Sequence, residues 1–186
     1  MTAIIILVVL LLLIAGIICF MIKIYNEMVR LRNSVKNAQA QIDTQLQRRF
    51  DLIPNLVETV KGYAAHEKEL LENVTASRNG YMNASSSEER MIMETQLSSS
   101  LRNLFAVVEN YPELKANTNF IHLQDELSET EDKLTYSRQF YNDAVTKYNN
   151  KLQMFPNVMI ANMFHFREEV LFEAQEGTKE VPKIQF

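Results

Sequence analysis

Residues 118–155 read TNFIHLQDELSETEDKLTYSRQFYNDAVTKYNNKLQMF. Large apolar or aromatic residues recur in this stretch at every seventh position, namely Phe120, Leu127, Leu134, Tyr141, Tyr148 and Phe155. A spacing of seven residues keeps side chains on one face of a helix, as in a coiled coil. The stretch therefore predicts a long helix that starts near Thr118, packs one face on other helices, and ends at Pro156.

A second apolar stripe precedes this helix. Its members follow each other at spacings of three, four or seven residues and are Met28, Leu31, Val35, Ala38, Ile42, Leu46, Ile53, Val57, Val60, Ala64, Leu71 and Val74. Pro54 interrupts the stripe without shifting its phase, and a proline inside a helix usually kinks it. We predict a kinked, nearly continuous helix, with a fresh start near Asp51 as the alternative, and a loop from Asn79 to Ser87.

Between these two segments lies a third candidate helix. Ser86 followed by Glu89 forms a capping-box pattern, and Pro112 ends the segment. Its apolar face carries Met91, Leu97, Leu101, Leu104 and Val108. A short amphipathic helix is expected from Val158 to Phe166. Because no alternating strand pattern is seen, the sequence predicts an all-α fold, an antiparallel bundle of three to four long helices.

The amino-terminal segment is of another kind. Residues 3–22 read AIIILVVLLLLIAGIICFMI, without a charge or a proline. As a helix they would span about 30 Å, the thickness of the bilayer core. A cleaved signal peptide is the alternative, but no basic segment precedes the run and no small-residue cleavage site follows it. We expect an uncleaved anchor over residues 1–22, a helical domain over residues 23–176 and a tail over residues 177–186.

The charges that flank this span predict its orientation. Lys23, Arg30, Arg32 and Lys36 follow it closely, and the positive-inside rule places such charges in the cytoplasm. We therefore expect a single-pass protein of the cell membrane, with its amino terminus outside and its helical domain in the cytoplasm. Translocation of the whole domain, to give an exported protein, is the alternative.

Composition argues against several classes of function. The net charge is -4, and no basic run is present, so a nucleic-acid partner is not expected. Four glycines and a single cysteine, Cys19, exclude a glycine-rich phosphate loop and a site made of several thiolates. His66-Glu67 begins a zinc-protease motif, but Leu70 stands where the second histidine is needed. We therefore expect no enzyme, no catalytic residue, no cofactor and no metal.

His66 leaves one sharper alternative open. A histidine followed by an acidic residue on a bundle helix can accept a phosphoryl group in a signalling relay. Because the chain has no nucleotide-binding segment, a kinase partner would have to supply that group. The simpler interpretation is a histidine on a charged surface.

Polar residues that interrupt the apolar faces are the candidate interaction or register residues. Glu67 lies in the first seam, Glu131 and Arg138 lie beside the heptad line, and Tyr141-Asn142 recurs as Tyr148-Asn149. Inward polar groups need partners across a bundle, so they fix its alignment. We expect Glu67 to pair with Arg138, and a partner-docking patch is the functional alternative.

A further charged cluster surrounds Pro54. It consists of Arg48, Arg49, Asp51, Asn55 and Glu58. These residues could bind a partner, but solvation of a bend together with pairs along one helix is the favoured interpretation.

Several blocks of the sequence resemble the LemA family. They are Gln41-Ile42-Asp43, the run from Gln45 to Ala64 that contains DLIPNLVETVKGYA, Tyr111–Asn117, Leu123–Leu127, Arg138–Asn142 and Val181–Phe186. The blocks agree in order and spacing from the anchor to the last residue, although Gln39 stands where the family often has Trp. The resemblance implies a bacterial-type single-pass membrane protein with an α-helical domain, and it implies no active site.

Together these features favour a membrane-anchored helical bundle that acts as a protein-interaction or scaffold module. Its expected partners are the lipid bilayer, through Ala3 to Ile22, and a protein that the sequence does not identify. The heptad face leaves self-association into a homo-oligomer open.

Overall fold

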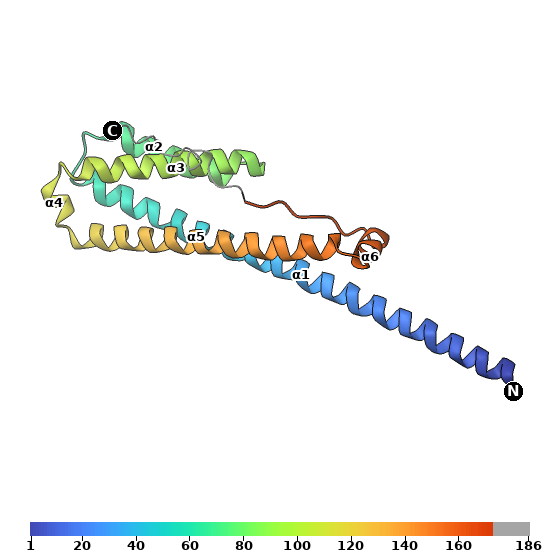
Figure 1. Cartoon of the computed structure of the whole chain (residues 1–186). Coiled ribbons are helices and arrows are strands. Elements are labelled where there is room, and N and C mark those ends of the chain that lie inside the picture. The colour runs from blue at the N-terminus through green and yellow to red at the C-terminus, as the bar shows by residue number, and fades with distance from the viewer. Residues whose placement is uncertain (173–186) are drawn as a thin grey trace, which may run out of the picture. The chain divides into compact units, whose positions relative to one another are not determined.

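The computed structural model describes residues 1–172, except for the side chains of Ser87 and Glu88. This part of the chain is all-α (Figure 1). Its helices are α1 (Thr2–Lys61), α2 (Lys68–Asn83), α3 (Ser87–Val108), α4 (Pro112–Lys115), α5 (Thr118–Gln153) and α6 (Asn157–Met163). The chain divides into two compact units. We call residues 1–42 and 136–186 the anchor unit and residues 43–135 the hairpin unit.

The hairpin unit is an antiparallel bundle of the end of α1, α2, α3 and the start of α5. Arg78 of α2 donates to the carbonyl of Phe50, and the Phe50 ring lies 4.4 Å from that of Tyr81. Because α1 and α2 are consecutive, contacts so far from the connecting turn require them to run in opposite directions. The α3–α5 pair closes in the same way, since Phe105 and Phe120 are in ring contact across α4.

The core of this unit is apolar and continuous. It contains the fully buried side chains of Phe50, Ile53, Leu56, Val60, Val74, Leu97, Leu104, Leu114, Phe120 and Leu134. The capping box predicted for α3 is confirmed, because the Glu89 amide donates to the Ser86 hydroxyl. The Glu89 carboxylate in turn accepts from the Ser85 amide and hydroxyl, and these hydrogen bonds lower the pKa of Glu89.

The anchor unit pairs the first part of α1 with the second part of α5. Lys151 of α5 forms an ion pair of 2.8 Å with Glu27 of α1. Met28, Val35 and Ala38 of α1 are buried, as are Tyr141, Val145 and Tyr148 of α5. After α6 the chain continues without helix to Phe172, and this extended segment, residues 167–172, lies along α5.

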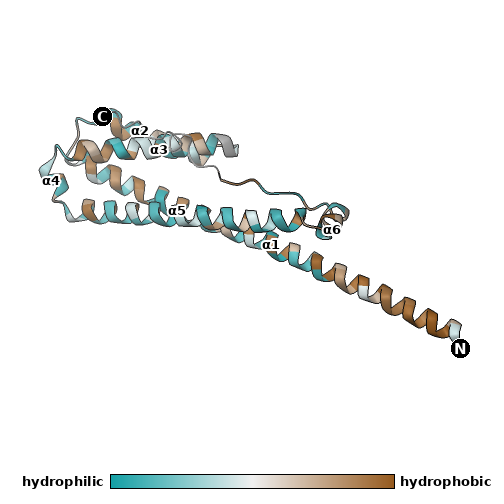
Figure 2. Cartoon of the chain, in the orientation of Figure 1, coloured by the Kyte–Doolittle hydropathy of each residue, from teal (hydrophilic) through white to brown (hydrophobic). Residues whose placement is uncertain are grey.

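The first third of α1 is apolar on every side (Figure 2). Its side chains are exposed throughout residues 1–20, although nearly all of them are aliphatic. Among the described residues, α1 is the helix that is long and apolar enough to cross a membrane. Since water does not tolerate such a surface, the chain is a membrane-associated helical protein.

Several predictions about the helices are confirmed. The long helix starts at Thr118, and α1 continues through Pro54. Five members of the heptad seam, Phe120 to Tyr148, are buried. The sixth, Phe155, is 81% exposed because α5 ends at Gln153, before the seam returns to the core.

Other predictions were wrong. The first stripe does not belong to one helix, because α1 ends at Lys61 and α2 begins at Lys68, so that Glu67 lies in a turn. Gly80, expected in a loop, lies inside α2, and Met91 is exposed on α3. The last short helix is α6, shifted to Asn157–Met163. The expected tail, residues 177–186, lies outside the described residues.

Candidate interaction site

Arg49 joins three helices of the hairpin unit. It occupies a position of the apolar stripe on α1 and is only 5% exposed. Its guanidinium forms an ion pair of 2.9 Å with Glu131 of α5 and donates to the hydroxyl of Ser98 on α3 at 3.1 Å. A buried guanidinium is tolerated only when its charge and its donors find partners. Arg49 and Glu131 thus fix the alignment of α1, α3 and α5.

The neighbouring charged residues face solvent. Arg48 lies 3.9 Å from Glu126 of α5, with both side chains partly exposed. Asp51 accepts a hydrogen bond of 2.8 Å from Gln47, one turn earlier on α1. Arg48, Asp51 and the exposed Asn55 line one polar concavity of the surface. Adjacent arginines therefore have different environments, and only Arg49 is part of the core.

Glu67 closes the turn between α1 and α2. Its carboxylate accepts a hydrogen bond of 2.9 Å from the hydroxyl of Tyr111, and this bond raises the pKa of Tyr111. Asn117 donates to the hydroxyl of Tyr63 in the same turn. The predicted pair of Glu67 with Arg138 was wrong in its premise, because the helix that was expected to carry Glu67 ends six residues earlier, at Lys61.

Arg138, Tyr141 and Asn142 lie in the anchor unit and hold the extended segment. Asn142 accepts from the amide of Phe172 at 2.8 Å and donates to its carbonyl at 3.0 Å. The hydroxyl of Tyr141 donates to the carbonyl of Val170, and burial raises the pKa of this tyrosine. The guanidinium of Arg138 lies 5.9 Å from the centre of the Phe172 ring. The Tyr141 ring also lies 5.0 Å from that of Phe172, so these residues contact both the backbone of the segment and the side chain of Phe172.

Asn149 repeats the Asn142 contact one heptad later. It accepts from the amide of Glu169 at 3.0 Å and donates to the carbonyl of the same residue at 2.8 Å. Seven residues of helix rise about 10.5 Å, and three residues of extended chain span about 10 Å. The heptad period of α5 therefore matches the three-residue step from Phe172 back to Glu169. We call Asn142 and Asn149 the asparagine clamp.

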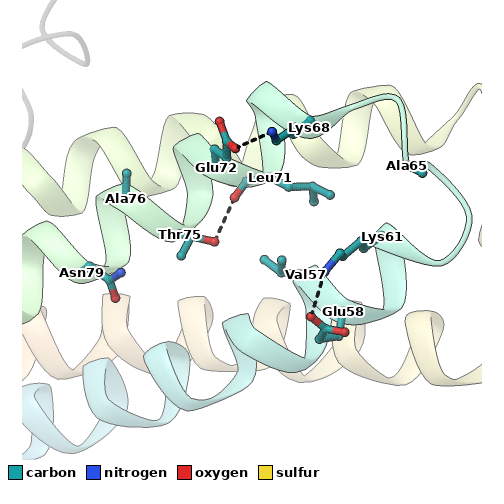
Figure 3. A pocket seen from close by; sticks show the side chains of 10 residues that line it. All are labelled: Val57, Glu58, Lys61, Ala65, Lys68, Leu71, Glu72, Thr75, Ala76 and Asn79. Carbon is teal, nitrogen blue, oxygen red and sulfur yellow. Dashed lines mark hydrogen bonds and ion pairs between the residues drawn. The ribbon is translucent and has the colours of Figure 1, made fainter.

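A groove lies between the end of α1 and α2 (Figure 3). It has a volume of about 560 Å³, and the side chains of Val57 and Leu71 point into it from opposite walls. Ala65 and Ala76 widen it because they are small. Two intrahelical ion pairs, Glu58 with Lys61 and Lys68 with Glu72, stand at its rim. We call this feature the α1–α2 groove.

His66 is exposed in the turn between α1 and α2. Within residues 1–172, no group of three or more His, Cys, Asp or Glu side chains is arranged to hold a metal ion.

Sequence reasoning missed two of these features. Asn149 was seen only as a repeat of the Asn142 phase, and no structure was predicted for its partner, the extended segment, because the expected helix ended at Phe166. The α1–α2 groove was missed because Val57 and Leu71 were placed on one helix. The helix break that separates them could have been suspected from Gly62, which has low helix propensity.

Comparison with known proteins gives this architecture a family. The model of the LemA family matches residues 38–186. Protein LemA of Metamycoplasma hominis is 26% identical over 152 residues, which are 81% of this chain and 69% of that protein.

Two magnetosome proteins are similar at lower identity. Magnetosome protein MamQ 2 of Paramagnetospirillum magneticum is 23% identical over 175 residues, and magnetosome protein MamQ of Magnetospirillum gryphiswaldense is 21% identical over 174 residues. Each alignment covers 80% of this chain and 64% of the relative, so the chain spans less than two thirds of their length. The family model, in contrast, covers most of this chain, and the chain belongs to the LemA family.

Proposed function

We propose that this protein is a membrane-tethered scaffold whose hairpin unit binds an amphipathic helix of a partner protein. The observation that carries the proposal is the α1–α2 groove, an apolar depression between two helices. The tether confines the groove to the membrane surface, where it raises the effective concentration of partners that are also membrane-bound.

The chemistry of the groove favours a helix with an apolar ridge. Val57 and Leu71 form apolar walls, and the rim lysines are each matched by a glutamate of the same helix. The rim is therefore close to neutral and attracts neither strongly acidic nor strongly basic segments. Binding would come from burial of aliphatic side chains, as when an amphipathic helix occupies a groove between two others.

Photo-crosslinking tests this proposal in intact cells. A benzoylphenylalanine placed at Ala65, on the groove, should capture a protein that the same residue placed at Ala106, exposed on α3, does not capture. A synthetic peptide of the captured region should then become helical when it binds the full-length protein in nanodiscs. Equal capture at both positions would contradict the proposal.

A matched pair of substitutions measures the contribution of the groove. Ala76→Glu places a charge against its apolar wall and should weaken peptide binding by about tenfold or more, a loss of at least 1.4 kcal/mol. Ala106→Glu introduces the same charge on an exposed face of α3 and should leave the dissociation constant unchanged. If both variants bind as the wild type does, the groove is not the binding site.

We further propose that the membrane is the bacterial plasma membrane and that the bundle faces the cytoplasm. The positive charge at Lys23, Arg30, Arg32 and Lys36 supports this orientation. In a Cys19→Ala background, Asn83→Cys gives a single exposed thiol at the end of α2. Protection of this thiol from an impermeant maleimide until lysis is expected. Labelling of intact cells would instead favour an exported domain.

A further inference from the structure

The connection from α5 through α6 is unusually apolar for a surface segment. No Asp, Glu, Lys or Arg occurs between Lys151 and Arg167. Five large apolar side chains of this stretch are about half exposed or more, namely Met154, Phe155, Met159, Met163 and Phe164. Other residues of the stretch, Asn157, Ile160 and Ala161, are buried and fix α6 against the rest of the anchor unit. The exposed side chains are therefore presented by a folded element.

The contacts of this stretch place it beside the end of the apolar span. The Phe164 ring lies 4.8 Å from that of Tyr25. Phe164 also lines an apolar pocket together with Ile18, Met21 and Ile22, the last residues of the span. The surface of this pocket is apolar, so the residues around α6 extend the apolar surface of α1 to one side of that helix.

The ion pair between α1 and α5 sets the level of the stretch along the membrane normal. The span ends at Ile22, and the headgroup layer adds about 5–7 Å on each side of the bilayer core, or three to five helical residues. Glu27 thus lies at the outer edge of that layer. Lys151 pairs with Glu27, whereas Phe164, later in the chain, contacts Tyr25 and lines the pocket with Ile18. The chain therefore runs from Lys151 toward the span, and Met154 and Phe155 lie on the membrane side of Glu27.

We propose that residues 154–164, which we call the interfacial segment, insert into the headgroup layer of the leaflet from which α1 emerges. The apolar composition fits this layer, where aromatic and other amphipathic side chains concentrate at the membrane surface. The charged residues Lys151 and Arg167 bracket the segment on its water side. A second membrane contact beside α1 fixes the orientation of the anchor unit, which one helix alone would leave free to rotate and tilt.

Fluorescence of a single tryptophan tests the inserted depth, because the chain contains no tryptophan. Phe155→Trp is made in the full-length protein and reconstituted in vesicles of phosphatidylcholine and phosphatidylglycerol. Its emission should shift to the blue. Lipids brominated on the acyl chain close to the headgroup should quench it more strongly than lipids brominated close to the terminal methyl group. Met159→Trp, at another exposed position of the segment, should behave in the same way.

Phe140→Trp provides the matched control. Phe140 is a half-exposed phenylalanine of the same unit, fifteen residues before Phe155 and on the far side of Lys151 from the span. Its tryptophan should emit as in water and show at most a few per cent of quenching by any brominated lipid. Flotation of each variant with the vesicles and its helical circular dichroism show that the span and the fold are intact.

The outcomes separate the bilayer from other occupants of the surface. Lipid quenching at both positions 155 and 159, absent at 140, supports the proposal. Blue-shifted emission without lipid quenching would show that protein covers the segment, such as a second copy of the chain, and would overturn it. Water-like emission at all three positions would also overturn it. The scaffold proposal would stand in either case, since the α1–α2 groove belongs to the hairpin unit.

Discussion

Helices pack through their side chains within each of the two units, but the anchor unit has an additional kind of internal contact. In the hairpin unit, side chains of separate helices contact each other, as Arg49 does with Ser98 and Glu131. In the anchor unit, the asparagine clamp binds the backbone of the extended segment at Glu169 and Phe172, while the Glu168 side chain of the segment accepts a separate hydrogen bond from Gln153. The first kind of contact needs a particular residue on each side. The clamp itself needs particular residues on α5 but no particular side chain in the segment.

The comparison predicts that the largest loss comes from Arg49. In the full-length protein in detergent micelles, Arg49→Ala should lower the free energy of unfolding by about 2–3 kcal/mol, because it leaves a cavity and removes the partners of Ser98 and Glu131. Arg48→Ala removes a looser, exposed pair and should cost less than about 0.5 kcal/mol. Denaturation by urea, followed by circular dichroism, measures both.

A third variant separates charge from packing at this position. Arg49→Met keeps an unbranched apolar stem, and Glu131 is 47% exposed, so water can solvate its unpaired carboxylate. We expect a smaller loss than for Arg49→Ala. If Arg48→Ala and Arg49→Ala lower the free energy of unfolding equally, the buried pair of Arg49 stabilises the hairpin unit no more than the exposed pair of Arg48 does.

Next in size is the loss of the asparagine clamp. Asn142→Ala and Asn149→Ala each remove two hydrogen bonds at a partly exposed site, worth about 1–2 kcal/mol together. The effect should be local: amide hydrogen exchange at Phe172 and Glu169 should become about tenfold faster, while exchange in α2 and α3 stays as in the wild type. Faster exchange throughout the hairpin unit would contradict the separation of the two kinds of contact.

Asparagine is needed here because it both donates and accepts. Asn142→Asp keeps the oxygen that accepts from the Phe172 amide but replaces the group that donates to the Phe172 carbonyl with a second acceptor. Exchange at Phe172 should then be as fast as in Asn142→Ala or faster. Slow exchange in Asn142→Asp would mean that the accepted bond alone holds the segment.

Substitutions in the extended segment itself test whether the clamp binds only its backbone. Glu169→Pro removes the amide that donates to Asn149 and should release the segment, seen as faster cleavage by trypsin after Arg167. Glu169→Ala keeps that amide and should leave the cleavage rate within about twofold of the wild type, an effect below about 0.5 kcal/mol. If alanine at position 169 releases the segment as proline does, its side chain is part of the contact.

Much of this fold could be predicted from local pattern. The heptad positions of α5 and the capping box of α3 depend on residues a few positions apart, and the structure confirms the capping box and five of the six heptad positions. Arg49 also carried a signal, since it occupies a position of the apolar stripe between Leu46 and Ile53, whereas Arg48 does not. An arginine at such a position predicts that its guanidinium has a partner on another helix, but it does not identify that partner.

The features of the fold that the sequence did not predict depend on contacts between distant parts of the chain. The turn between α1 and α2 preserves the phase of the stripe on both sides, so periodicity alone could not reveal it. Its closing bonds, from Tyr111 to Glu67 and from Asn117 to Tyr63, join residues that are 44 and 54 positions apart. The α1–α2 groove, which exists because of this turn, could not be predicted for the same reason.

The smallest expected effect concerns the ion pair that ties α5 to α1 in the anchor unit. The hydrogen bond from Lys151, followed by the nearby positive charges of Lys151, Arg30 and Lys23, lowers the pKa of Glu27 below its ordinary value of 4.5. A carboxyl whose pKa is lower in the folded state stabilises that state above the unfolded pKa and loses this contribution as the pH falls through the folded pKa. The pair therefore stabilises the anchor unit at neutral pH and loses this contribution as the pH falls from the ordinary value through the lower pKa of the folded state.

Glu27→Gln isolates this contribution. The thermal midpoint of the full-length protein in micelles should be slightly lower in Glu27→Gln than in the wild type at pH 7, and the two midpoints should converge as acidification protonates Glu27 in the folded state. Glu58→Gln, which removes an exposed pair with Lys61 in the hairpin unit, should show a smaller difference at every pH. Because Glu27 is the side chain that sets the level of α5 against the apolar span, its loss should also reduce lipid quenching of a tryptophan at position 155. A wild-type midpoint that falls no further than that of Glu27→Gln on acidification would mean that side-chain packing alone holds α5 to α1 in the anchor unit.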